Sequence, residues 1–586
     1  MVLFLDNAES ILDPQETDAR DIYAMVEELS RFNNISLCIT SRISIVPPHC
    51  NRLMIPTLSM ESACDIFYGI YKDGGQSDSV KDLVQQLEFH ALSITLLATT
   101  AAHSLWDYDR LVKEWNAQRS QVLRTEHNES LAATIELSLT SPTFNKLGPN
   151  ARELLGVVAF FPQGVDENNF DWLFPTILNG KDIFDKFCVL SLTHRSNGFI
   201  TMLAPLRDYL GPRDPRSSPL LRTTKDRYSD RLQLLGDLEP DQPGFKESRW
   251  IRSEDVNVEY LLNVFILFDI DADHIWDTCA GFFTHLDWHK PRFTILGPKI
   301  EGLPDDHHSK PRCLFRLSQL FHSLGNYVEQ KRLLTHTLEL ERDRGNDGGV
   351  ARTLRYLVLA NRELRLFEEG RQRSREALEI YEQLGDAEGQ AKCWNSLGWL
   401  LVNDNQLDVA EEAASHALKL FLDQGREYWV CDSHRLLSEI HRSKGEKGKS
   451  IHHCEAALEI ASPFDWHDQL FWIHYSLAWL FYDVNNFDKS QAHIKQSKPY
   501  AVDNAYYLGR TMALQAWIWY SQGRLEEATA EVLRALETFE RLGATRDLGE
   551  CRDYLQDIEL AVRIRSNLGD SSSSGGFSGH NASYTR

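Results

Sequence analysis

The sequence lacks a long apolar run, because no stretch of its 586 residues approaches the ~20 that a membrane-spanning helix needs. Its first five residues are apolar but have no basic flank and meet Asp6 at once, so a signal peptide is not predicted. An excess of positive charge is also missing, since 62 basic residues face 85 acidic ones. The net charge of −23 argues against general attraction to nucleic acid or to an anionic membrane.

Paired cysteines are missing as well. The ten cysteines are scattered along the chain and no two form a CxxC pair, which indicates reduced, mostly packed thiols in a cytoplasmic protein. The acidic stretch 269–273 lacks the glycine and glutamate of a calcium loop, and the adjacent acids and histidines of 305–308 lack zinc-ligand spacing. No catalytic triad or carboxylate pair stands out. The sequence therefore predicts no metal site and no catalytic residues.

A 40-residue repeat fills the carboxy-terminal half of the chain. Its clearest unit runs from Ala391 through Trp394 and the Leu-Gly pair at 397–398 to a row of alanines. Equivalent units begin at Pro311, Ala351, Ala391, Cys431 and Phe471, with a sixth near Gly509.

Small side chains dominate positions 8, 20 and 27 of this unit, where two antiparallel helices have to approach closely. These positions hold Ser318, Val358, Gly398, Ser438, Ala478 and Ala516, then Gln330, Gly370, Ala410, Ser450, Ser490 and Ala528, and then Thr337, Ala377, Ala417, Ala457, Ser497 and Ala535. The pattern fits the tetratricopeptide repeat (TPR). We therefore predict a mainly α protein with a right-handed TPR superhelix over 311–565, about six repeats plus a capping helix.

Positions 2, 5, 9 and 12 of each first helix are expected on the concave face of such a superhelix. They are rich in arginine and aromatic residues, which dominate binding surfaces. The alternative is that the tryptophans pack between repeats and the arginines are solvated. The binding interpretation predicts a groove for a protein or peptide partner, formed by Arg352, Arg355, Lys392, Trp399, Arg435, Arg442, Trp479, Tyr482 and Trp517.

The first 60 residues predict part of an α/β domain. Residues 2–5 form an apolar strand that ends in Asp6, a helix follows over about 15–31, and a second strand, 36–40, ends in Ser41 and Arg42. Asp6 and Arg42 would then lie at the carboxyl ends of the strands, where open α/β sheets bind ligands.

The order of these segments resembles the STAND class of signalling P-loop NTPases, specifically NB-ARC/NACHT-like proteins with TPR tails, a type abundant in fungi. Asp6 matches the Walker B acid and Arg42 the sensor arginine of that class. The segment 89–98, which contains His90, is similar to the family segment that opens a helix beside the adenine. Residues 147–209 look like its winged-helix domain. The resemblance implies ADP or ATP with magnesium, and a homo-oligomer in the active state.

The phosphate loop of that family is missing, since no GxxxxGK[ST] occurs anywhere in the sequence. Without it no backbone cradle and no lysine hold the phosphates, so this chain is not expected to be an enzyme or to keep a cofactor. Either the loop lies upstream of Met1, or this is a degenerate member kept as a scaffold. We therefore predict a partner-binding, STAND-like regulator. The alternative is a nucleotide-binding switch completed by upstream sequence.

The predicted domains follow from these segments. They are a partial P-loop domain at 1–60, a helical ARC-like domain at 61–125, a winged-helix-like domain at 126–213, a helical linker with degenerate repeats at 214–310, the TPR array at 311–565 and a disordered tail at 566–586.

Overall fold

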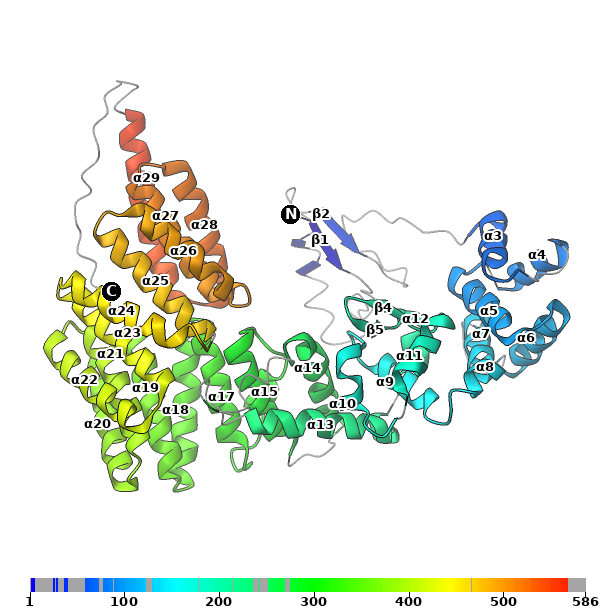
Figure 1. The fold of residues 1–586 in the computed structure, drawn as a ribbon, viewed down its shortest axis with the longest axis horizontal. Helices are drawn as coiled ribbons and strands as arrows, with labels where there is room; N and C mark the ends of the chain where they lie inside the picture. The colour runs from blue at the N-terminus through cyan, green and yellow to red at the C-terminus, as the bar shows by residue number, and fades with distance from the viewer. Residues whose placement is uncertain are drawn as a thin grey trace. The chain divides into compact units, whose positions relative to one another are not determined.

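The computed structural model describes residues 2–5, 25–26, 28–29, 36–39, 58–72, 77–87, 89–122, 129–177, 179–212, 214–235, 242, 251–268, 274–464 and 466–567. Most of these residues are helical (Figure 1). They form two compact units, one of residues 1–148 with 189–192 and one of 149–188 with 193–586. Across the described ranges, no helix is long and apolar enough to cross a membrane. The nine described cysteines are all free thiols.

The first unit contains a pair of parallel strands and a helical bundle. Strands β1 (Val2–Leu5) and β2 (Ser36–Ile39) pair in parallel, from Val2 opposite Ser36 to Leu5 opposite Ile39. Both strands were predicted, whereas most of the helix expected over 15–31 lies outside the described residues. The bundle consists of α3 (Met60–Ile70), α4 (Ser77–Gln86), α5 (Ala91–Ser104), α6 (Tyr108–Val122), α7 (Glu129–Thr140) and α8 (Pro142–Asn145). Its core gathers on α5 and includes the fully buried Phe67 and Trp115.

The second unit opens with short helices around a small antiparallel sheet of strand order β3-β5-β4. Gly164 adopts φ +79°, and a Cβ there would lie 2.0 Å from the carbonyl oxygen of Ile200 on β5, so only glycine fits this turn. The elements are α9 (Ala151–Phe160), β3 (Val165–Asp166), η1 (Glu167–Asn169), α10 (Phe170–Leu173), α11 (Gly180–Val189), β4 (His194–Ser196), β5 (Phe199–Thr201), α12 (Ala204–Leu210) and η2 (Pro215–Ser217).

Four helices connect this part to the repeats: α13 (Pro219–Leu235), α14 (Ile251–Leu267), α15 (Ile275–His289) and α16 (Gly297–Glu301). Helix α15 packs against α13 on one side and against the first repeat helix on the other. Arg292 donates to Asp255 at 3.1 Å and to Glu259 at 2.5 Å, which fastens the segment after α15 to α14. The region predicted as a linker is thus packed onto the end of the repeat array.

Six antiparallel helix pairs and a final helix form the repeat array. They are α17 (Lys310–Ser323) with α18 (Tyr327–Asp343), α19 (Asp347–Glu363) with α20 (Phe367–Leu384), α21 (Ala387–Asn403) with α22 (Leu407–Gln424), α23 (Glu427–Ser443) with α24 (Lys447–Ala461), α25 (His467–Asp483) with α26 (Phe487–Ala501), α27 (Ala505–Ser521) with α28 (Leu525–Leu542), and α29 (Thr545–Asn567). The predicted TPR-like repeat array is confirmed, and a further helix, α29, follows its six pairs. From the second pair on, each first helix begins four residues before the expected unit start.

Local chemistry explains these boundaries. The side chains of Asn346, Asp386 and Asn504 accept a hydrogen bond from a backbone N–H of the first turn and so cap their helices. All residues at positions 8, 20 and 27 of the unit are buried, as close helix crossing requires. Every turn inside a pair uses one residue of positive φ: Gly325, Arg365, Asn405, Gly445, Asn485 and Gly523. Five of these six are glycine or asparagine, which tolerate a left-handed backbone, and Arg365 is the exception.

The crossing of α13 and α15 yields a test of this packing. A Cβ on Gly281 would lie 2.0 Å from the backbone oxygen of Leu232, so Gly281→Ala has to push the two helices apart. We expect a loss of about 1–3 kcal/mol in unfolding free energy, measured by urea denaturation. Gly448→Ala in α24 is the matched control, since nothing lies within 4 Å of its Cβ. It should be neutral or stabilising by up to about 1 kcal/mol. Equal stability of both variants would contradict the close approach.

Candidate ligand-binding groove

The first helices of five successive repeats contribute one alternating row of cations and indoles, which we call the ladder: Arg362, Trp399, Arg435, Trp472 and Arg510. Arg362 Cζ lies 5.5 Å from the ring centroid of Trp399. Arg435 Cζ lies 5.6 Å from Trp399 and 5.9 Å from Trp472. Arg510 Cζ lies 5.8 Å from Trp472. Each contact is within cation–π range, so the ladder is continuous from α19 to α27.

The ladder follows from the repeat length. Its members are 36 to 38 residues apart, whereas the repeat is 40 residues long. From Arg362 to Trp472 each member therefore stands about one helical turn of ~3.6 residues nearer the start of its helix than the member before it. Trp472 and Arg510 stand at the same level of their helices, because α25 and α27 begin 38 residues apart. A residue moved by one turn keeps the same helix face. The ladder consequently crosses the inner surface of the array obliquely and keeps all five side chains on it.

Carboxylates hold most of these guanidinium groups in place. Arg435 donates to Asp432 at 2.6 Å and to Gln469 at 3.0 Å. Arg510 donates to Asp547 at 2.6 Å. Arg442 donates to Glu439 at 2.6 Å and to Asp483 at 3.2 Å. The inner surface is therefore mixed in charge, where the sequence suggested a basic and aromatic one.

This inner surface bounds a cavity of about 2000 Å³. Seven of the predicted groove residues line it: Arg355, Trp399, Arg435, Arg442, Trp479, Tyr482 and Trp517. Two do not. Arg352 lies over the Phe315 ring at 4.8 Å, and Lys392 pairs with Glu388 at 2.6 Å and lies over the Trp429 ring at 5.0 Å. Both belong to position 2 of their repeats, and in these two repeats neighbouring aromatic rings cover that position.

Several lining residues were not among the predicted site residues. Arg362 and Trp472 occupy positions 12 and 2 of their units, so the rule of positions 2, 5, 9 and 12 includes them. Asp432 also occupies position 2, but an acid was not sought in a groove expected to be basic. Asp287 lies on α15, outside the six repeats, and no periodic signal could have found it.

The residues assigned by family resemblance lie in the first unit. Asp6 and Arg42 are outside the described residues. His90 is the N-cap of α5, where its Nδ1 accepts a hydrogen bond from the Ser93 N–H at 3.3 Å, and its side chain is exposed. The described part of the chain contains no group of three or more histidine, cysteine, aspartate or glutamate side chains suited to a metal ion.

The two ends of the array meet beside the cavity in a contact that we call the closure: Tyr327, Glu363, Tyr506, Arg546 and Asp547. The hydroxyls of Tyr327 and Tyr506 lie 2.9 Å apart, and Tyr506 donates to Asp547 at 3.1 Å. Arg546 on α29 forms an ion pair with Glu363 on α19. The first and second repeats thus contact the sixth repeat and the capping helix, so the array forms a ring around the cavity.

Burial shifts the pKa values of several ionisable groups that line the cavity. It raises the pKa of the Asp287 carboxyl to about 6 and also raises the pKa of Asp468. It lowers the pKa of the Arg362 guanidinium to about 10. Burial and the nearby Arg362 charge lower the pKa of His322 to about 4. All four shifts disfavour the charged form, so these groups gain little compensation from their surroundings in the free protein.

Comparisons with known proteins leave the family open. No family model and no curated protein matches the sequence. Among solved structures, the chain is similar to a Signal Transduction ATPase with Numerous Domains (STAND) protein with a tetratricopeptide repeat sensor from Pyrococcus horikoshii. That match has 13% identity and a TM-score of 0.47, and covers 96% of this chain and 82% of the other.

Two further solved structures are weaker matches. One is the quorum sensor NprR from B. thuringiensis in its apo form, with 13% identity, a TM-score of 0.30 and coverage of 58% and 98%. The other is yeast Tom70, with 14% identity, a TM-score of 0.29 and coverage of 83% and 88%. At these scores the repeat fold rests on the helix pairs described above.

The closure can be opened selectively. Arg546→Ala leaves Glu363, whose side chain is 6% exposed, without one of its two arginines. We expect local opening to become easier by about 1–3 kcal/mol. Hydrogen exchange should then quicken in the turn 324–327 and at the start of α27, and stay unchanged in α22. The matched control is Arg534→Ala on α28, since Arg534 is 63% exposed. Unchanged exchange at both ends of the array would show that the closure does not hold them together.

Proposed function

We propose that the chain is a binding scaffold whose repeat array holds a protein or peptide partner in its groove. One observation carries the proposal: a continuous cation–indole ladder that faces a cavity of about 2000 Å³. Tryptophan, tyrosine and arginine are enriched among the few residues that carry most of the binding energy at protein interfaces. Helical repeat arrays present extended concave surfaces of this kind.

The size and the polar groups of the cavity favour a peptide over a small metabolite. Small-molecule pockets usually have volumes of about 300–1,000 Å³, well below this cavity. The lining also places buried amides among the aromatic rings: Gln319, Asn395 and Gln469. Amide side chains offer both donors and acceptors, and so can hydrogen-bond the backbone of an extended peptide.

The paired arginines make the groove rigid before the partner arrives. Arg435 donates hydrogen bonds to Asp432 and Gln469, and its Cζ lies over the rings of Trp399 and Trp472. A side chain held in this way loses little conformational entropy on binding, so each contact with a partner yields more net free energy. The ladder is thus suited to recognition as it stands.

The test exposes the purified chain to a defined pool of synthetic peptides and identifies those retained. Arg435→Ala should weaken the binding of the retained peptides about 30-fold, which corresponds to the loss of about 2 kcal/mol expected for an interface hot spot. Arg534→Ala, on the outer surface, should bind like the wild type. Tryptophan fluorescence gives a direct readout, because Trp399, Trp472, Trp479 and Trp517 line the groove. If the retained peptides bind Arg435→Ala as tightly as the wild type, their binding site lies outside the ladder. If the chain retains no peptide from the pool, the proposed function is wrong.

A second function, an ADP- or ATP-binding switch of the STAND type, is supported by the strand pair of the first unit. β1 and β2 are parallel and in register, so that Leu5 and Ile39 lie opposite each other at the carboxyl ends of the two strands, and Asp6 and Arg42 come shortly after them in the sequence. On this proposal His90 opens the helix beside the base, 126–213 is the winged-helix-like domain, and active copies assemble. The remaining domain boundaries stand as predicted from the sequence.

The nucleotide proposal is tested by titrating the chain with fluorescent ADP and ATP in the presence of magnesium. Because the sequence has no phosphate loop, we expect no saturable binding by these 586 residues. If binding is observed and Asp6→Ala abolishes it, the site works without the loop and the switch becomes the leading function. If Asp6→Ala leaves the observed binding intact, the nucleotide lies at another site.

A further inference from the structure

Two carboxylates reach the cavity without an ion pair in the described residues, although the charge of Arg316 acts on Asp287 and that of Arg435 on Asp468. Asp287 on α15 accepts a hydrogen bond from the Ser323 hydroxyl at 2.5 Å, and Asp468 on α25 accepts one from the Tyr428 hydroxyl. Within the described residues neither forms an ion pair, whereas Asp432, Glu439 and Asp483 of the same cavity each face an arginine. The two groups also repel each other, since Asp468 contributes to the raised pKa of Asp287.

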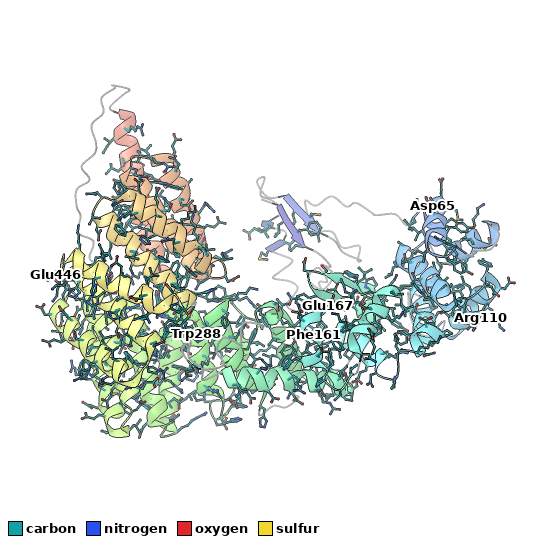
Figure 2. The ribbon with its side chains drawn as sticks, viewed as in Figure 1. Asp65, Arg110, Phe161, Glu167, Trp288 and Glu446 are labelled. Carbon is teal, nitrogen blue, oxygen red and sulfur yellow. The ribbon has the colours of Figure 1, made fainter. Side chains whose placement is uncertain are left out.

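Aromatic rings surround this pair of carboxylates. The rings of Trp288 (labelled in Figure 2) and Tyr428 meet edge to face at 5.9 Å. Trp472 Nε1 donates to the hydroxyl of Tyr507 at 3.3 Å, and the charges of Asp468 and Asp287 both act on Tyr507. Aromatic rings and unpaired carboxylates together favour a cation, through ring quadrupoles and direct charge attraction.

The positive charge of Arg362 is only partly compensated by the carboxylate beside it. The carboxylate that Arg362 contacts, Glu363, is shared with Arg546. The Nε of Arg362 is buried and has no hydrogen-bond partner in the described part of the chain. The carboxylate pair and Arg362, which we call the two poles, flank the end of α17. Ser323 donates a hydrogen bond to Asp287, and the charge of Arg362 lowers the pKa of the neighbouring His322. Both poles therefore belong to one cavity.

We propose that the occupant of the groove is a peptide with charges of both signs, whose ammonium or guanidinium lies between Asp287 and Asp468 and whose carboxylate lies against Arg362. The inference rests on the proposed binding function and names the chemistry of its partner. Such a ligand supplies each pole with the counter-charge that the protein leaves out. A purely acidic peptide would leave two buried carboxylates uncompensated, and a purely basic one would leave Arg362.

The experiment uses end-capped synthetic peptides that contain one lysine and one glutamate around a tyrosine, with spacers of increasing length. Matched peptides carry acetyl-lysine for lysine, or glutamine for glutamate. Binding to the full chain is followed by tryptophan fluorescence and calorimetry. For the best spacer we expect each neutralised peptide to bind at least tenfold more weakly than its charged parent.

Variants assign each pole. Asp287→Asn should remove the preference for lysine over acetyl-lysine and keep the preference for glutamate, while Arg362→Gln should do the reverse. Asp230→Asn, an exposed aspartate on α13, is the matched control and should change neither preference. If the variants leave both preferences intact, or if peptides without lysine bind as well as those with it, the charge pattern is wrong although the groove still binds peptides. If no panel peptide binds while pool peptides do, the charge pattern again fails alone.

A ligand-free measurement checks the carboxylate pole at Asp287 independently. Burial raises the pKa of Asp287, so its ionised form costs stability that the protonated form does not. Wild-type stability should therefore fall as pH rises from the ordinary aspartate range to about 6. Asp287→Asn should melt above the wild type at neutral pH, and this advantage should disappear at low pH. A lower melting temperature at neutral pH would mean that Asp287 has a stabilising role in the free protein, and would overturn this pole.

Discussion

Close approach of paired helices is the constraint on which the array depends. Two helices can pack tightly only if the residues between them are small, and the chain meets this need at three positions of each repeat. Gly398, for example, would place a Cβ 2.7 Å from the Leu436 side chain of the next repeat. Because these crossings recur every 40 residues, and after 38 in the last repeat, every first helix turns the same face inward. The groove is thus a consequence of the packing that stabilises the fold.

Charge inside the groove divides into two classes with different physical roles. Paired groups such as Arg435 and Asp432 compensate each other's charge at short distance, so they determine the shape of the groove more than they attract a ligand. Groups that form no ion pair in the described residues, such as Asp287, or that share their partner, such as Arg362 with Glu363, keep more of the cost of their burial. A folded protein tolerates that cost where function requires it, which is why the second class is the better guide to the ligand.

The sequence predicted the repeat well because the repeat is periodic. The positions of the small residues followed from one alignment of the chain with itself, and seven of the nine residues expected in the groove line the cavity. Arg365 could not be predicted from its residue type, because it adopts positive φ in a turn where glycine or asparagine would be usual. Arg352 and Lys392 were expected in the groove but do not line the cavity, because the rings of Phe315 and Trp429 lie against them and equivalent rings do not occur in every repeat.

Other features of the site could not be predicted at all. The hydroxyls of Tyr327 and Tyr506 are 179 residues apart in sequence, and their contact depends on how strongly the array curves. Curvature is the sum of small rotations between repeats, which a repeat pattern does not fix. Asp287 depends on a different circumstance, the packing of α15 against α17.

The position of Asp287 ties the groove to the helices that precede the repeats. Helix α15 presents Asp287 to the cavity on one side and crosses α13 at Gly281 on the other. A ligand bound to both Asp287 and Asp468 would connect α15 to α25, and its binding energy would depend on how firmly α15 is held. The same energy would then stabilise the crossing of α13 and α15, because linkage between binding and packing is reciprocal. Occupancy of the groove and order in the segment before the repeats are therefore two readouts of one equilibrium.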